Sequence, residues 1–164
     1  MGGVLTFCGS EPAHPDWTED NPVPGPQPVG DLNTSNCARK LAGITWGGRT
    51  YLMPAIHLAE ADFQEEFGGR PLRNRPAQEI LIVTDGKLSD AAEFEAWVAQ
   101  ADETAVVCVA VVGYGRGHDD AVAHYKAIAA KNRYVTVVAF TGVSDPREVA
   151  FDLRLLSGTA AAPA

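Results

Sequence analysis

The chain has 164 residues, a hydrophobic fraction of 46% and a formal net charge of −8 at pH 7. This length predicts one domain with its own hydrophobic core rather than two domains. The acidic balance argues against binding to nucleic acid or to anionic membranes, because both partners require clustered Lys and Arg.

The cysteines argue against a zinc site and against a disulfide framework. Cys8, Cys37 and Cys108 are odd in number and widely spaced, with no Cys-x-x-Cys pair. Cys108 lies in an apolar run and is expected to be a buried hydrophobic residue. Free thiols are typical of a reducing compartment, and no apolar run is long enough to cross a membrane, so we expect a cytoplasmic protein.

The N-terminal part of the chain has few regular patterns. An apolar run at Gly3–Gly9 predicts a strand. Residues 11–30 hold six prolines, which predicts a long irregular loop with at most a short edge strand near Pro28. Asp31 would cap a helix over residues 32–43.

From residue 51 onward, helix and strand patterns alternate. Helices are predicted at Tyr51–Phe67, Ser89–Ala101, His118–Lys131 and Pro146–Leu156, strands at Glu79–Thr84, Ala105–Val112 and Tyr134–Phe140, a loop at Gly69–Pro76, and a frayed tail at 159–164. This alternation predicts an α/β fold: a single doubly wound domain, residues 1–158, with an open, mostly parallel sheet and helices on both faces.

Two short segments indicate a site at one edge of this sheet. The buried strand ends in Thr84-Asp85-Gly86, which places the Asp85 carboxylate at the carboxyl end of the strand, where open α/β sheets bind ligands. Upstream, Gly47-Gly48-Arg49-Thr50 opens a helix. A hydroxyl and a carboxylate meeting there would suit a hard cation such as Mg²⁺.

These segments resemble the von Willebrand factor A-like (vWA) family. Gly47-Gly48-Arg49-Thr50 is similar to the family's threonine loop, Thr84-Asp85-Gly86 to its aspartate turn, and Val109 to Gly115 to its next strand and turn. The resemblance implies a metal-ion-dependent adhesion site with Thr50 and Asp85 as ligands. It also implies Mg²⁺ with one position open to an acidic side chain of a partner protein.

The chain departs from the family pattern at one place. The family's Asp-x-Ser-x-Ser motif, which follows its first strand, does not occur in these 164 residues. The resemblance therefore implies a gap between the strands near Val4 and Ile80. Three explanations stay open: a fragment or late start site, a strand supplied by another chain, and a degenerate, metal-free relative.

The resulting prediction is a non-catalytic protein-binding module with a partial metal site. Thr50 and Asp85 would hold the metal weakly, and Ser10, Gly48, Arg49 and Gly86 would contact the partner. The competing explanations are that Asp85 is an ordinary turn residue and that Thr50 is a helix N-cap.

Two other functional classes remain as alternatives. The first is a small α/β enzyme or nucleotide- or phosphate-binding protein that uses the loop Gly113–Gly117. The second is a structural domain of a larger assembly. An enzyme is not favoured, because His14, His57, His118 and His124 fall on separate elements; His57 and His118 are expected at the surface.

Overall fold

The computed structural model describes residues 3–7, 27–31 and 50–141. The expected helices over 32–43 and Pro146–Leu156, most of the proline-rich loop and the frayed tail lie outside the described residues. By contacts the chain divides into two compact units, one up to Arg73 together with Leu88–Asp90, the other Asn74–Lys87 and from Ala91 onward. The single domain expected over residues 1–158 stays a prediction.

The first unit contains a short antiparallel ribbon and a helix. Strand β1 (Gly3–Thr6) pairs with β2 (Gln27–Asp31), and helix α2 (Met53–Phe67) contacts β1. The register shifts between Val4 and Leu5, where the partner strand carries Pro28, which has no N–H to donate. The edge strand expected near Pro28 is confirmed, while the strand expected over Gly3–Gly9 is assigned only over Gly3–Thr6.

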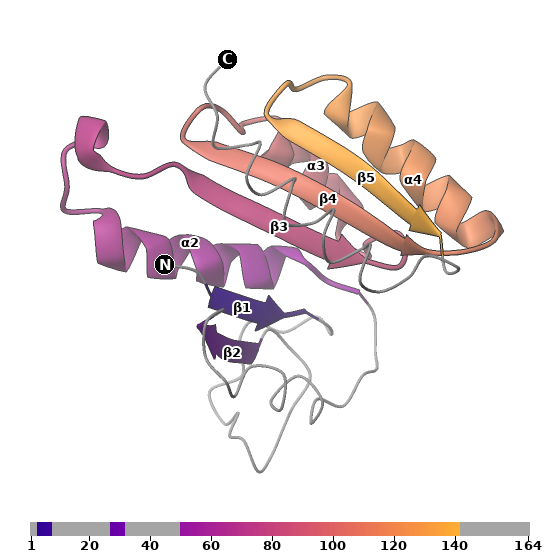
Figure 1. Cartoon of the computed structure of the whole chain (residues 1–164), viewed down its shortest axis with the longest axis horizontal. Helices are drawn as coiled ribbons and strands as arrows, with labels where there is room; N and C mark the ends of the chain where they lie inside the picture. The colour runs from indigo at the N-terminus through magenta and orange to yellow at the C-terminus, as the bar shows by residue number, and fades with distance from the viewer. Residues whose placement is uncertain (1–2, 8–26, 32–49, 142–164) are drawn as a thin grey trace, which may run out of the picture. The chain divides into compact units, whose positions relative to one another are not determined.

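The second unit is a three-stranded parallel sheet with two crossover helices (Figure 1). Its strand order is β3-β4-β5, so β4 is central and the other two strands are edges. Its elements are β3 (Gln78–Thr84), α3 (Ala91–Val98), β4 (Ala105–Gly113), α4 (Arg116–Ala129) and β5 (Val135–Thr141), and a 3₁₀ turn, η1 (Leu72–Asn74), lies within the expected loop over Gly69–Pro76.

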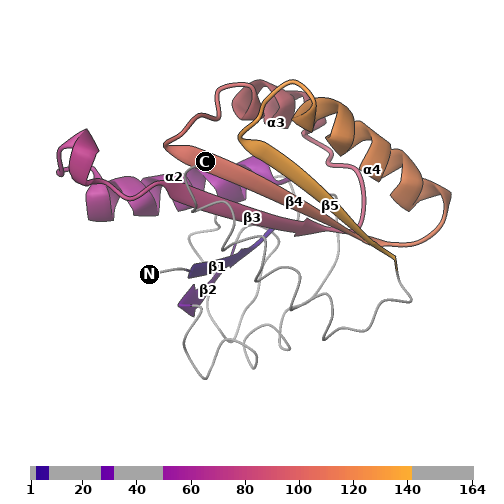
Figure 2. The ribbon, with the colours of Figure 1, turned by 45° about the horizontal axis from the view of Figure 1, so that its top comes forward.

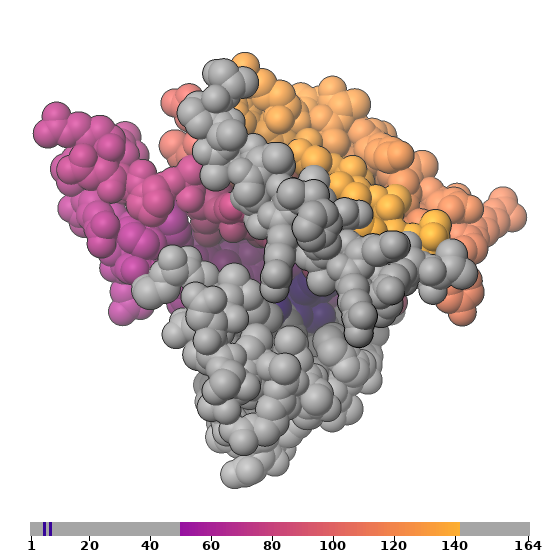
Figure 3. Space-filling view, viewed as in Figure 1, coloured from indigo at the N-terminus to yellow at the C-terminus, as the bar shows by residue number. Residues whose placement is uncertain are grey.

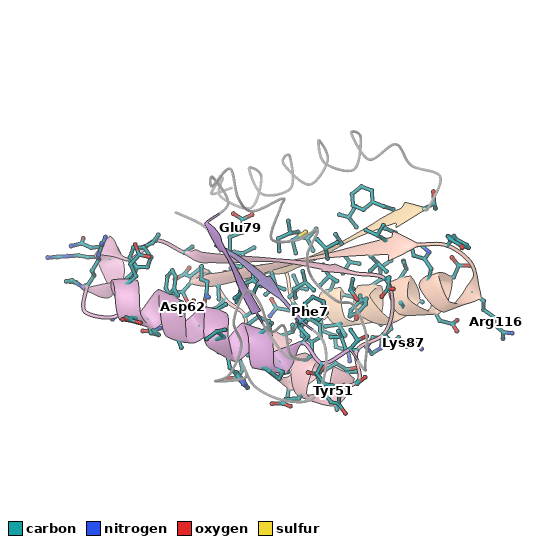
Figure 4. All side chains as sticks on the ribbon, turned by 90° about the horizontal axis from the view of Figure 1, so that it is seen from below. Phe7, Tyr51, Asp62, Glu79, Lys87 and Arg116 are labelled. Carbon is teal, nitrogen blue, oxygen red and sulfur yellow. The ribbon has the colours of Figure 1, made fainter. Side chains whose placement is uncertain are left out.

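One face of this sheet packs against α3 and α4, which lie on the same side (Figures 2 and 4). Phe94 of α3 and Tyr125 of α4 are both 1% exposed and meet edge to face, with ring centroids 6.1 Å apart. Val107, Val109 and Val111 of β4 are at most 1% exposed. The surfaces of α4 and β5 join without a break in the space-filling view (Figure 3).

The α/β character with a parallel sheet is therefore confirmed, but helices on both faces of the sheet are not confirmed within the described residues. Two right-handed crossovers that step in the same direction, β3 to β4 to β5, place both helices on the same face.

The expected helices and strands of this unit are present with shifted ends. The largest shift is in α3, which was expected over Ser89–Ala101. The backbone N–H of Ser89 instead donates to the carbonyl of Thr50 at 2.7 Å, and the amide side chain of Asn132 donates to the carbonyls of Val98 and Ala101. These contacts between residues distant in sequence fix the ends of the helix.

Among the described residues, no helix combines the length and the apolar character that a membrane span requires.

Candidate functional site

The candidate site lies at the carboxyl end of β3 and β4, within the second unit. Asp85 follows the last residue of β3 directly, and its side chain is exposed, while Thr84 before it is 5% exposed. A parallel strand thus ends in a solvent-exposed carboxylate, as the sequence predicts, but the strand itself is not fully buried: only Ile82 and Thr84 of β3 are buried.

The turn that carries Asp85 is held by two hydroxyl groups. The Oγ1 of Thr84 donates to the carbonyl of Gly86 at 3.2 Å, and the Gly86 N–H lies 3.4 Å from the same oxygen. The hydroxyl of Tyr125, a buried residue of α4, donates to the Gly86 carbonyl at 3.0 Å. Asp85 is therefore presented by a fixed turn rather than by a loose loop.

An open hollow of about 440 Å³ adjoins this turn. It combines two carboxylates, one ammonium group and the first turn of α4. Its lining residues are Asp85, Gly86, Lys87, Tyr114, Gly117, His118 and Asp120. Lys87 and Arg116 both lie toward the end of the sheet at which the strand arrowheads point (Figures 1 and 4).

The start of α4 leaves backbone amides near the hollow. Gly115 is the N-cap, with a φ of 79° that favours glycine, and it makes no side-chain cap hydrogen bond. The first amides of a helix lack partners within the helix and attract negative charge. The carboxylate of Asp119 in the first turn supplies part of the negative charge that these amides attract.

His118 corrects the expectation of a surface histidine. It is 6% exposed, with Nε2 3.4 Å from the Val111 carbonyl and Nδ1 3.4 Å from Oδ1 of Asp119. Both neighbours accept hydrogen bonds, and a neutral imidazole donates from only one nitrogen. The ring ties the start of α4 to the end of β4. His57, by contrast, is exposed as expected.

In the first unit, the structure rejects the explanation of Thr50 as a helix N-cap. The N-cap of α2 is Leu52, and the backbone N–H groups of Leu52 and Met53 donate to Oδ2 of Asp90 at 2.8 and 2.7 Å. Asp90 lies within the helix expected over Ser89–Ala101. It caps another helix instead, and within the described residues its buried Oδ1 has no hydrogen-bond partner.

The remaining predicted site residues divide into two groups. Gly86 lies at the hollow beside Asp85. Ser10, Gly48 and Arg49 lie outside the described residues. Sequence reasoning missed Tyr125 and Asp90. Their partners are 39 and 37–38 residues away in the sequence, and no local motif marks such contacts.

A comparison of this chain with models of known protein families and with curated proteins finds no match.

Proposed function

We propose that this chain is a non-catalytic protein-binding module of vWA type that engages an acidic group of a partner protein at the carboxyl edge of its parallel sheet. Asp85 and Thr50 would contribute oxygen ligands to a Mg²⁺ ion that bridges to the partner. The single observation that carries the proposal is the exposed Asp85 carboxylate beside an open polar hollow. The turn that presents it is held by hydrogen bonds from the hydroxyl groups of Thr84 and Tyr125.

Thr50 enters the proposal as the ligand that the vWA resemblance implies. Its hydroxyl is not accounted for by capping of α2, because Asp90 supplies that cap.

The donor set fits a hard cation, but only weakly. A hydroxyl and a carboxylate are the oxygen ligands that Mg²⁺ prefers, and water would occupy most of its octahedron. In the part of the chain that the structure describes, no three or more His, Cys, Asp or Glu residues gather as a metal cluster. Lys87 at the same hollow would weaken the binding of the cation by repulsion and would attract the partner's carboxylate.

Thermal unfolding with the metal alone tests this proposal. At about ten times its dissociation constant, Mg²⁺ would stabilise the native chain by roughly 1.4 kcal/mol and raise Tm by about 3–6 °C. We expect Asp85→Asn and Thr50→Val to remove this rise. Asp120→Asn, at the same hollow but not an assigned ligand, is the matched control and is expected to keep it.

An unchanged Tm at millimolar Mg²⁺ and Mn²⁺, or a rise that persists in Asp85→Asn, would contradict the metal site.

A second candidate function rests on the start of α4. Tyr114 and Gly117, on either side of the N-cap region at Gly115, line the same hollow as Lys87, which favours a phosphate group on the amides of the Gly113–Gly117 loop. In this case inorganic phosphate or a nucleotide would raise Tm without metal. Lys87→Gln would lower that effect, while Asp85→Asn would not.

A further inference from the structure

A histidine and a glutamate meet between the two helices that pack on the parallel sheet. Nε2 of His124 in α4 lies 3.7 Å from Oε1 of Glu95 in α3. The two helices lie side by side on one face of the sheet (Figure 2), and neither residue lines the hollow beside Asp85. Because His124 and Glu95 are far apart in the sequence, no local motif marks this pair.

The Nε2 atom of His124 is buried and makes no hydrogen bond. Among the described residues it has no hydrogen-bond partner, and its distance to Glu95 is longer than a hydrogen bond. A ring nitrogen that is removed from water without a partner costs stability, so a ligand at this atom would be favourable. The ring itself is held in place, because it meets the Tyr125 ring edge to face with centroids 5.4 Å apart.

The Glu95 carboxylate is open to an added ligand. Its side chain is 43% exposed, while that of His124 is 24% exposed, so solvent reaches the pair from the side of Glu95. Within the part of the chain that the structure describes, Glu95 forms an ion pair with His124 only, and no Lys or Arg neutralises it. The net charge of −8 adds a general attraction for cations.

We propose that Glu95 and His124 together bind a zinc ion between α3 and α4, with water completing its coordination. Zinc takes imidazole nitrogen and carboxylate oxygen at about 2.0–2.2 Å, so two such ligands of a tetrahedral ion lie about 3.3–3.5 Å apart. The observed separation of 3.7 Å requires a shift of only about 0.3 Å to reach this arrangement. The neutral ring with its proton on Nδ1 offers the Nε2 lone pair to the ion.

A bound ion would link the two crossover helices at a second point, besides the contact between Phe94 and Tyr125. Because the ligands come from both helices, the ion binds the native chain in preference to the unfolded one and stabilises it. This inference does not rest on the proposed Mg²⁺ site, since it uses other residues and another metal.

Calorimetric titration of the full chain with zinc chloride is the first test. Cys8 and Cys37 are replaced by serine in every variant, so that their thiols do not bind the ion. With only two protein ligands we expect a Kd on the order of 10 µM, far weaker than that of four-ligand zinc sites. Glu95→Gln and His124→Gln are each expected to weaken binding at least about tenfold.

Two exposed residues provide matched controls. Glu93→Gln changes another carboxylate of α3, and His57→Gln changes the exposed histidine of α2. Both variants are expected to bind zinc as tightly as the parent chain. Thermal unfolding of the same chains should show a rise in Tm with zinc that the controls keep and that Glu95→Gln and His124→Gln lose.

Nuclear magnetic resonance of the histidine rings tests the site even if His124→Gln folds poorly. Zinc should shift the ring signals of His124 and leave those of His57 in place. Glu95→Gln changes only a half-exposed side chain, so it should keep the fold and reduce the shift of His124 at the same zinc concentration.

No zinc binding at millimolar concentration, or binding that Glu95→Gln and His124→Gln leave unchanged, would overturn this proposal. A shift of the His57 signals in place of those of His124 would do the same. No Mg²⁺ is present in these experiments, so their failure and the failure of the Mg²⁺ site are separate results.

Discussion

The two edge strands of the parallel sheet have the same length and the same neighbour, but their exposed residues differ. Each contains seven residues and pairs with β4. β3 exposes Glu79, Leu81 and Val83, whereas β5 exposes Thr136, Ala139 and Thr141. Both strands contain four consecutive apolar residues, so the difference lies in the side chains that they expose: two large apolar ones in β3, and only small or polar ones in β5.

This difference indicates that β3, rather than β5, is the strand at which we expect contacts with a partner. β3 also carries the turn that presents Asp85, fixed by Thr84 and by Tyr125 of α4. One strand thus combines an anchored polar turn at its carboxyl end with two exposed apolar side chains, Leu81 and Val83. β5 shows no comparable exposure of large apolar side chains, so we interpret it as a boundary of the sheet.

The largest expected effect comes from the inward and outward positions of β3. Ile82 is 3% exposed on the face that packs against the helices, so Ile82→Ala is expected to lower the free energy of unfolding by about 3 kcal/mol. Leu81→Ala is expected to cost less than about 1 kcal/mol because the side chain is already exposed.

Urea unfolding checks both values. Equal losses for Ile82→Ala and Leu81→Ala would show that Leu81 is enclosed within the monomer, and the contrast between the two edges would fail.

Much of the second unit was predictable, because its patterns are strong and local. The apolar runs of β3 and β4 and the helical periodicity of α4 appear in the sequence without any knowledge of contacts. The position of β3 at the edge of the sheet was not predictable. An apolar composition indicates that a strand can be buried, but it does not identify the element that packs beside it.

Only part of the candidate site was predictable from the sequence. Asp85 could be placed at the end of a strand, because an apolar run that ends in Asp-Gly is typical of a strand followed by a turn. The anchoring of its turn by Tyr125 and the burial of His118 depend on where α4 crosses the sheet. The capping of α2 by Asp90 depends on a contact between residues 37–38 positions apart, which no local pattern encodes.

The next expected effect concerns the anchored turn. Tyr125→Phe removes the hydroxyl that donates to the Gly86 carbonyl, and we expect a loss of about 1 kcal/mol in unfolding free energy. Tyr134→Phe is the matched control, because the Tyr134 hydroxyl is held by Arg133 in an exposed contact, and its loss is expected to be within about 0.5 kcal/mol.

Hydrogen exchange at the amides of Gly86 and Lys87 gives a second readout, which should speed up in Tyr125→Phe. Unchanged exchange would mean that the turn after β3 does not need α4, and would weaken the distinction between the two strands.

The smallest expected effect uses the one charged residue within either edge strand, Glu79 of β3. Partial burial raises the pKa of the Glu79 carboxyl above its usual value. The native state therefore holds this proton more tightly than the unfolded state does. The stabilisation from protonation is present at low pH and is lost as the pH rises through the raised pKa. Glu79→Gln mimics the protonated form, so it should match the natural chain in acid and exceed its stability at neutral pH by no more than a few tenths of a kcal/mol, given solvent screening.

Asp102 is the control of opposite sign. Its pKa is lowered, chiefly by the hydroxyl of Thr104 and then by the Thr104 backbone N–H, so its contribution is present above the ordinary pKa and is lost as the pH falls through the lowered value. Asp102→Asn should therefore lower stability at neutral pH and match the natural chain in acid. The two variants, compared by urea unfolding at acid and neutral pH, should differ in direction. A Glu79→Gln variant that loses stability at neutral pH would show that the ionised carboxylate has a favourable partner at the β3 edge, and that this edge is not the apolar surface inferred from Leu81 and Val83.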